Sequence, residues 1–220
     1  MATAAGRQKI VAAVIGRKSA ASADESTPLE LTVLDQVIFS ICREDSLQEK
    51  AEAAFRNLQT RFFDWNEVRV SSTAELMEAL AGLSNSRARA ERITGFLQEH
   101  FEATYAFDLE GLLKKGVKGT SKQLEKAPGM NDFTLAWVNQ RALKAQTIPV
   151  DSSTLRCAKR LELVDSTEDK IPAAREALEG MVAKTKVIDF TDGSGIELGQ
   201  ALSGELPVIA LSGYGAPEDV

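Results

Sequence analysis

Two features that could do chemistry lie about twenty residues apart in the second half of the chain. The first is a turn, Ala127-Pro128-Gly129, between two runs with helical apolar spacing, the second of which begins near Asn131. The other is a single carboxylate, Asp151, directly before a third helical run. Main-chain amides at a helix start can bind an anion such as phosphate, and a carboxylate can activate water or stabilise positive charge. Residues 124–160 are therefore the first place to look for a function.

Both features also have a plain structural explanation. Aspartate is a favoured N-cap, so Asp151 would suit the start of helix 152–160 without any reaction. A Pro-Gly pair is a common turn signal, so residues 127–129 could simply join two helices. Capping and catalysis can coexist in Asp151, and the sequence leaves both interpretations open.

Basic residues gather just before the turn. Residues 110–126 hold five lysines and two acids, a local net charge of +3 in a chain of net charge −6. A second group, Arg87, Arg89 and Arg92, is partly offset by Glu91. Such clusters suit a phosphate-binding surface, although a solvated helix face is the alternative. The five lysines are Lys114, Lys115, Lys118, Lys122 and Lys126.

Composition predicts a helical protein with a proper core. The 220 residues are 44% hydrophobic and only 6% aromatic, and long alternating β-branched runs are scarce. That pattern indicates a mostly helical protein. A sequence pI near 5.1 argues weakly against nucleic acid, but net charge says nothing about local patches.

Cysteine and histidine usage narrows the chemistry. Cys42 and Cys157 are too few and too far apart for an iron–sulfur cluster or a disulfide scaffold, so we expect no metal site and a reducing cytoplasm. His100 is the only histidine, so no histidine-based mechanism is proposed. No apolar run approaches the roughly 20 residues of a membrane span, and we expect no membrane association.

Apolar spacing predicts the helices that would carry these residues. Pro28 suits the first turn of a strong helix that ends near Cys42. Ser72, three residues before Glu75, is a capping signal for a short helix. Residues 63–69 are expected to be a connecting loop. Further helices are predicted at residues 47–62, 87–101 and 168–184.

Three regions are predicted along the chain. Residues 1–27 form a basic N-terminal segment, a loosely docked helix followed by a linker. Residues 28–186 form the main domain. Residues 187–220 are a Gly/Pro-containing C-terminal segment that we expect to be a tail.

Four segments have an order and spacing that resemble a known family. They are residues 28–45, Gly82-Leu83-Ser84-Asn85-Ser86-Arg87-Ala88, residues 124–134 and Val150-Asp151-Ser152-Ser153-Thr154-Leu155-Arg156. Over about residues 28–185, the chain resembles the endonuclease III-like helix–hairpin–helix (HhH-GPD) DNA glycosylases. The resemblance implies an all-α, two-lobed fold with a groove between the lobes. One lobe would hold residues 45–140, and the other would combine the first core helix with the helices after Asp151.

The resemblance also implies an activity, base-excision repair by cleavage of an N-glycosidic bond in double-stranded DNA. Asp151 would be the essential carboxylate. The carbonyls of the hairpin turn would hold a monovalent cation, and no other cofactor is expected. Cys42 matches the glutamine that fills the gap left by a flipped base. The residues implied to contact DNA are Ala127, Pro128, Gly129, Met130, Asn131, Lys122, Arg87 and Cys42.

Four positions depart from the family pattern. Phe133 matches the lysine that forms a Schiff base in bifunctional members, so a monofunctional glycosylase without AP-lyase activity is expected. Asn131 stands in place of a second hairpin glycine, and asparagine tolerates a positive φ. Ser153 matches a histidine, and the four clustered cysteines of iron–sulfur members are absent from the sequence.

Two other functions stay open at this point. The departures at Phe133, Cys42 and Ser153 would also suit a glycosylase-derived protein that binds DNA without catalysis. A helical interaction module that never touches DNA is the third possibility. For either DNA-binding function we expect a monomer in the cytoplasm, associated with the nucleoid.

Overall fold

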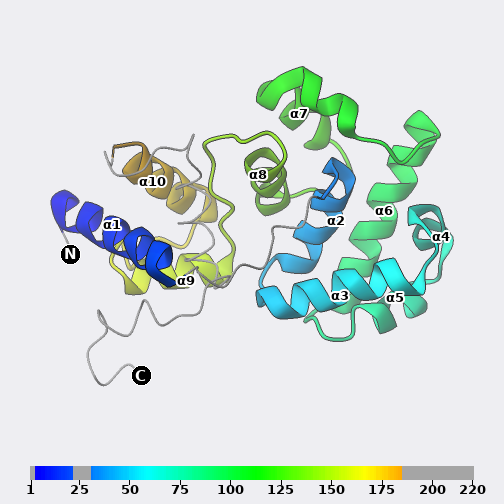
Figure 1. Ribbon diagram of the computed structural model, residues 1–220, viewed down its shortest axis with the longest axis horizontal. Coiled ribbons are helices and arrows are strands. Elements are labelled where there is room, and N and C mark those ends of the chain that lie inside the picture. The colour runs from blue at the N-terminus through cyan, green and yellow to red at the C-terminus, as the bar shows by residue number, and fades with distance from the viewer. Residues whose placement is uncertain (1–2, 22–30, 185–220) are drawn as a thin grey trace. The chain divides into compact units, whose positions relative to one another are not determined.

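A computed structural model describes residues 3–21 and 31–184 (Figure 1). All regular structure in these residues is helical, as the composition predicts. The helices are α1 (Ala4–Ala21), α2 (Val33–Arg43), α3 (Gln48–Arg61), α4 (Trp65–Val70), α5 (Thr73–Ala79), α6 (Ser86–Thr104), the 3-10 helix η1 (Glu110–Lys115), α7 (Gly116–Leu124), α8 (Asp132–Arg141), α9 (Ser152–Arg160) and α10 (Ile171–Lys184). No described helix is both long and apolar enough to cross a membrane.

The chain divides into two compact units. The first, Glu30–Leu143, contains α2 to α8 and η1. The second combines Met1–Leu29 with Lys144–Val220 and contains α1, α9 and α10. The predicted boundaries at residues 28 and 186 fall among residues outside the described part, as does the predicted tail, so they stay predictions.

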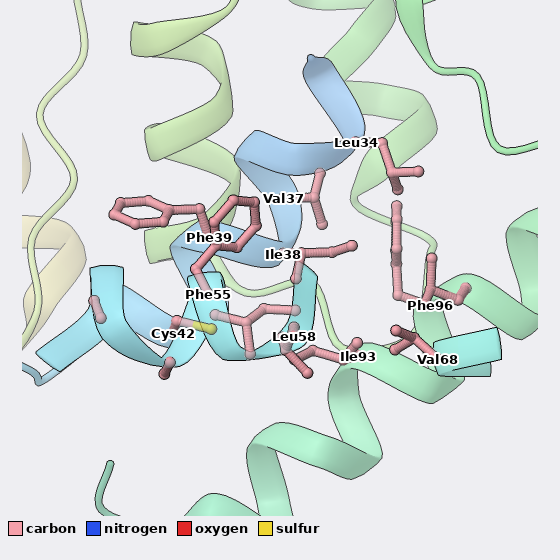
Figure 2. Packing of buried hydrophobic residues seen from close by; sticks show 14 of the residues in the cluster. Leu34, Val37, Ile38, Phe39, Cys42, Phe55, Leu58, Val68, Ile93 and Phe96 are labelled. Carbon is pink, nitrogen blue, oxygen red and sulfur yellow. The ribbon is translucent and has the colours of Figure 1, made fainter. Parts of the chain in front are cut away.

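Helix α2 is the centre of the unit Glu30–Leu143. Every residue of α2 except Asp35 is buried, and the helix packs against α3, α6 and α8. Figure 2 shows its side chains in a cluster with those of α3 and α6. The Phe39 ring meets the Phe55 ring edge-on at 5.4 Å between centroids and lies 5.7 Å from the Trp137 ring. A helix that is apolar on nearly all sides needs such neighbours all round.

Helix α2 is the predicted first core helix, but its first residue and the lobe it belongs to differ from the prediction. The helix begins at Val33, after a capping box between Thr32 and Asp35, and Pro28 lies outside the described residues. It also belongs to the unit that contains the hairpin, where it packs against α3, α6 and α8. The lobe assignment was wrong because apolar spacing shows that a helix is buried but not which helices bury it.

The predicted loop at residues 63–69 is wrong as well. Residues from Trp65 onward form α4, whose N-cap Asp64 accepts a hydrogen bond from the Glu67 amide at 2.8 Å. Six residues are too few for a periodic pattern, so the aspartate cap was the only local signal. The predicted box between Ser72 and Glu75 is confirmed at the start of α5.

The second unit has its own small core. Val11 of α1, Ala158 of α9, and Ala174 and Leu178 of α10 are buried together. The helix predicted at residues 168–184 is thus present as α10, and α1 packs against it. Glu179 of α10 accepts hydrogen bonds from the Thr147 hydroxyl at 2.6 Å and the Ile148 amide at 2.9 Å. Those bonds fix the segment that leads to Asp151.

We expect Phe55→Ala to lower the free energy of unfolding by about 3–5 kcal/mol, because it opens a cavity in a packed core. Phe55 is 2% exposed, whereas Phe63, a few residues further on, is 94% exposed. Phe63→Ala is therefore the matched control and should change stability by less than about 0.5 kcal/mol. Denaturant unfolding followed by circular dichroism measures both. Equal losses in the two variants would contradict the position of α3 in the core.

Candidate functional site

The predicted hairpin joins α7 to α8. The Ala127 amide donates to the Leu124 carbonyl at 2.9 Å, and the Met130 amide donates to the Ala127 carbonyl at 3.3 Å. Gly129 takes a positive φ of 77°, which glycine adopts without strain. The chain thus reverses within a few residues and enters α8 at Asp132.

Asn131 serves the turn in a different way from the one we expected. Its φ is −138°, which is extended backbone, so no positive φ is needed there. Its Oδ1 instead accepts from the Thr134 amide at 2.9 Å, which makes Asn131 the N-cap of α8. Amides of the first helical turn have no intrahelical acceptor. The start of α8 therefore has the donors that an anion requires.

The turn packs against helix α6 at Arg92. A Cβ added to Gly129 would lie 2.7 Å from the Arg92 carbonyl oxygen, so the turn sits directly on the α6 backbone. The Arg92 side chain also reaches back, and its Nε donates to the Gly129 carbonyl at 2.9 Å. Position 129 therefore requires glycine for two reasons, the positive φ and the close approach of the Arg92 carbonyl.

The lysines before the hairpin are exposed. Lys114, Lys118, Lys122 and Lys126 face solvent, and exposed Lys115 donates to Gln123 at 2.7 Å. The carboxylate of Glu110, one of the two acids in the run, accepts from the Val33 amide at 2.7 Å. η1 and α7 therefore present a basic surface that continues to the hairpin.

The three arginines of α6 have three different environments. Arg87 has a side chain 76% exposed and pairs with Glu91 at 2.9 Å. Arg89 is 5% exposed, and burial lowers the pKa of its guanidinium. Arg89 donates to the carbonyls of Ser84 at 2.8 Å and Glu44 at 2.6 Å, so it supports chain turns. Arg92 lies at the hairpin. Of the three arginines, Arg87 has the side chain that is most exposed to solvent.

Cys42 is a core residue. Its side chain is fully buried, and Figure 2 shows it within the cluster around α2. Burial raises the pKa of the Cys42 thiol to about 12, which keeps it protonated. The predicted contact between Cys42 and DNA is therefore contradicted by its burial, and Cys42 is a packing residue of the core.

Phe133 also belongs to the core. It is 3% exposed, and its ring lies 5.9 Å from that of Trp137. Phe133 is thus a packing residue of the core. Trp137 in turn donates from Nε1 to Gln36 at 2.9 Å, which ties α8 to α2.

Asp151 caps α9. Its Oδ1 accepts from the Thr154 amide at 2.7 Å, and the residue is 2% exposed. Ile148 and Val150, which precede Asp151 in the chain, are buried in the core of this unit. The predicted capping role of Asp151 is thereby confirmed. The hydroxyl of Thr154 is buried and has no hydrogen-bond partner in the described part of the chain.

Other titratable groups add no further site. In residues 3–21 and 31–184, no three His, Cys, Asp or Glu side chains cluster so that they could hold a metal ion. His100 is stacked on Phe96 with ring centroids 6.3 Å apart, and burial lowers its pKa. Sequence reasoning missed Glu44, whose carboxylate contacts Asn131 from 87 residues away; no local pattern signals such a pair.

Comparison with known proteins rests on structure alone. No protein-family model matches the chain, and no curated protein matches it in sequence. A non-covalent endonuclease III–DNA complex is similar over 91% of this chain and 86% of that chain, with a TM-score of 0.65 and 15% identity. The H. pylori 3-methyladenine DNA glycosylase MagIII bound to 1,N6-ethenoadenine is similar over 90% and 96%, with a TM-score of 0.66 and 13% identity. A thermostable thymine-DNA glycosylase is similar over 86% and 87%, with a TM-score of 0.54 and 16% identity.

These likenesses show the fold. The chain has the all-helical fold of the helix–hairpin–helix DNA glycosylases, as the four sequence segments predicted. The hairpin and the aspartate at a helix start are both present, each in its own unit.

We expect Gly129→Ala to destabilise the protein by about 1–3 kcal/mol, because the new Cβ meets the Arg92 carbonyl at a strained φ. Gly82→Ala is the control, since a Cβ at position 82 meets nothing within 4 Å and Gly82 has no positive φ. It should change stability by less than about 0.5 kcal/mol. Thermal or denaturant unfolding compares the two. A neutral Gly129→Ala would refute the close packing of turn and helix.

Proposed function

We propose that the chain is a DNA glycosylase of base-excision repair, which hydrolyses the N-glycosidic bond of a damaged or mismatched base in double-stranded DNA. The observation that carries the proposal is the hairpin followed by Asp151 at a helix start, in a chain with the glycosylase fold. The solved neighbours are a DNA complex of endonuclease III and two glycosylases acting on different bases. The lesion class is therefore left to experiment.

Asp151 is the proposed catalytic residue. As the bond between C1′ and the base nitrogen breaks, positive charge builds on the sugar ring, and a nearby carboxylate stabilises it. A water oxygen then bonds to C1′, while the water's proton passes to the carboxylate or the departing base. The bond from the Thr154 amide fixes the orientation of Asp151, so the carboxylate is preorganised for this role.

Hydrolysis by water alone is the proposed mode. A bifunctional enzyme forms a Schiff base through an amine, and residues 127–133 include no lysine. The aromatic side chain of Phe133 is buried against Trp137. We therefore infer base release without cleavage of the strand at the abasic site.

DNA binding is assigned to the hairpin, residues Ala127 to Asn131, together with Lys122 and Arg87. First-turn amides of α8 suit a phosphate. Exposed cationic side chains add the electrostatic part of the affinity. A monovalent cation at the turn carbonyls, a monomeric state and a cytoplasmic, nucleoid-associated location complete the proposal.

A second candidate function is DNA binding without catalysis. It is favoured by the departures at Phe133, Cys42 and Ser153, of which Phe133 and Cys42 are buried in the core. Base release from any lesion would rule it out.

The test is a panel of duplexes that contain uracil, an oxidised pyrimidine, a T·G mismatch, 3-methyladenine or 1,N6-ethenoadenine. We expect wild type to release one of these bases, with strand breaks appearing only after alkali treatment. Asp151→Asn should slow release at least about a hundredfold while DNA affinity is retained. Asparagine caps a helix as well as aspartate does, so α9 should stay intact.

Asp64→Asn is the matched control. Asp64 caps α4 by the same kind of bond, from the Glu67 amide at 2.8 Å. This variant should keep full activity. Unchanged base release by Asp151→Asn would contradict the catalytic assignment. Strand cleavage at the abasic site without alkali treatment would contradict the monofunctional mode.

Lys122→Gln should weaken binding to every duplex and reduce the slope of log affinity against log salt by about one, because one phosphate contact is lost. Lys50→Gln, an exposed lysine of α3 outside the basic run, is the control and should leave the slope unchanged. Fluorescence anisotropy over a series of salt concentrations measures both. Identical slopes for the two variants would remove Lys122 from the interface.

A further inference from the structure

An acidic side chain lies against the hairpin. Glu44, in the loop after α2, accepts from Asn131 Nδ2 at 2.8 Å through Oε1 and 3.0 Å through Oε2. Its Oε2 also accepts from Arg92 Nη1 at 2.6 Å. Side-chain exposures of 20% for Glu44 and 25% for Arg92 show a partly buried pair, in which charge-assisted hydrogen bonds are strong.

Arg92 links that carboxylate to the rest of the hairpin. Its Nε donates to the Gly129 carbonyl at 2.9 Å, and its Nη2 donates to the Thr134 hydroxyl at 3.1 Å. One planar guanidinium therefore connects the turn, the first helical turn of α8 and the loop after α2. Its rigid fork of donors sets their relative orientation.

The loop itself is anchored to the core. The Glu44 carbonyl accepts from Arg89 Nη2 at 2.6 Å, and Arg89 is almost fully buried. The Ser46 hydroxyl accepts from the same nitrogen at 3.2 Å. Arg89 therefore fixes the backbone of Glu44, and the carboxylate of Glu44 binds the hairpin through Asn131 and Arg92.

We propose that Glu44 and Arg92 lock the hairpin in the shape that binds a DNA phosphate, so that an acid raises the affinity for a polyanion. The inference rests on the proposed function. Direct electrostatics would give the opposite sign, because a negative charge near a phosphate site disfavours binding. Glu44 is a positioning residue, and its contribution is the reduced cost of ordering the turn on binding.

The sign of the effect tests the lock. Glu44→Gln and Glu44→Ala remove a negative charge, yet we expect them to weaken DNA binding by about tenfold. Glu125→Gln is the matched control, an exposed acid at the C-cap of α7, two residues before the hairpin. It should bind DNA as tightly as wild type or more tightly. Glu44 variants that bind as well as Glu125→Gln would overturn the proposal.

Amide hydrogen exchange on the free protein tests the lock without DNA. Exchange at Met130 and Thr134, whose amides donate within the turn, should accelerate in Glu44→Ala, while exchange at Leu58 in the core of α3 stays unchanged, which separates a loosened hairpin from global destabilisation. Arg92→Ala should accelerate the same exchange. The loss of exchange protection in the double variant should be smaller than the sum of the losses in the two single variants. Unchanged hairpin exchange overturns the lock. Accelerated exchange in a protein that binds no DNA would support the lock and defeat the proposed function instead.

Discussion

Burial of α2 is the constraint on which the unit Glu30–Leu143 depends. All of its residues but Asp35 are removed from solvent, so the helix needs α3, α6 and α8 around it. That requirement places the start of α8, and with it the hairpin, beside α6. It also places the loop after α2 within reach of the hairpin, where Glu44 meets Asn131. An apolar constraint thus positions a polar site.

The hairpin shows how backbone geometry and side-chain contacts combine. Gly129 supplies a positive φ and the room for α6, and Asn131 caps α8. Arg92 then connects both sides of the turn, and Glu44 neutralises part of its charge. The guanidinium donors of Arg92 are therefore bonded within the protein, to the turn, to α8 and to the loop after α2.

Asp151 illustrates how a structural role can coexist with a chemical one. The bond from Thr154 makes it a cap, and the same bond restricts its rotamer. A carboxylate fixed in this way needs no reorganisation when charge develops nearby. Capping is therefore a reason for, rather than against, the role proposed for this residue.

The sequence by itself determined what is local: the helical class, the capping box at Ser72, the Pro-Gly turn and the cap at Asp151. These depend on a few neighbouring residues, and four such segments in order were enough to predict the glycosylase fold. Only the tertiary structure decided that Arg89 is buried while Arg87 is exposed, that Cys42 lies in the core, and that α2 packs with α8. It alone brought Glu44 to Arg92 and Asn131, 48 and 87 residues away. Burial and long-range pairing depend on which helices meet, and no spacing within one helix encodes that.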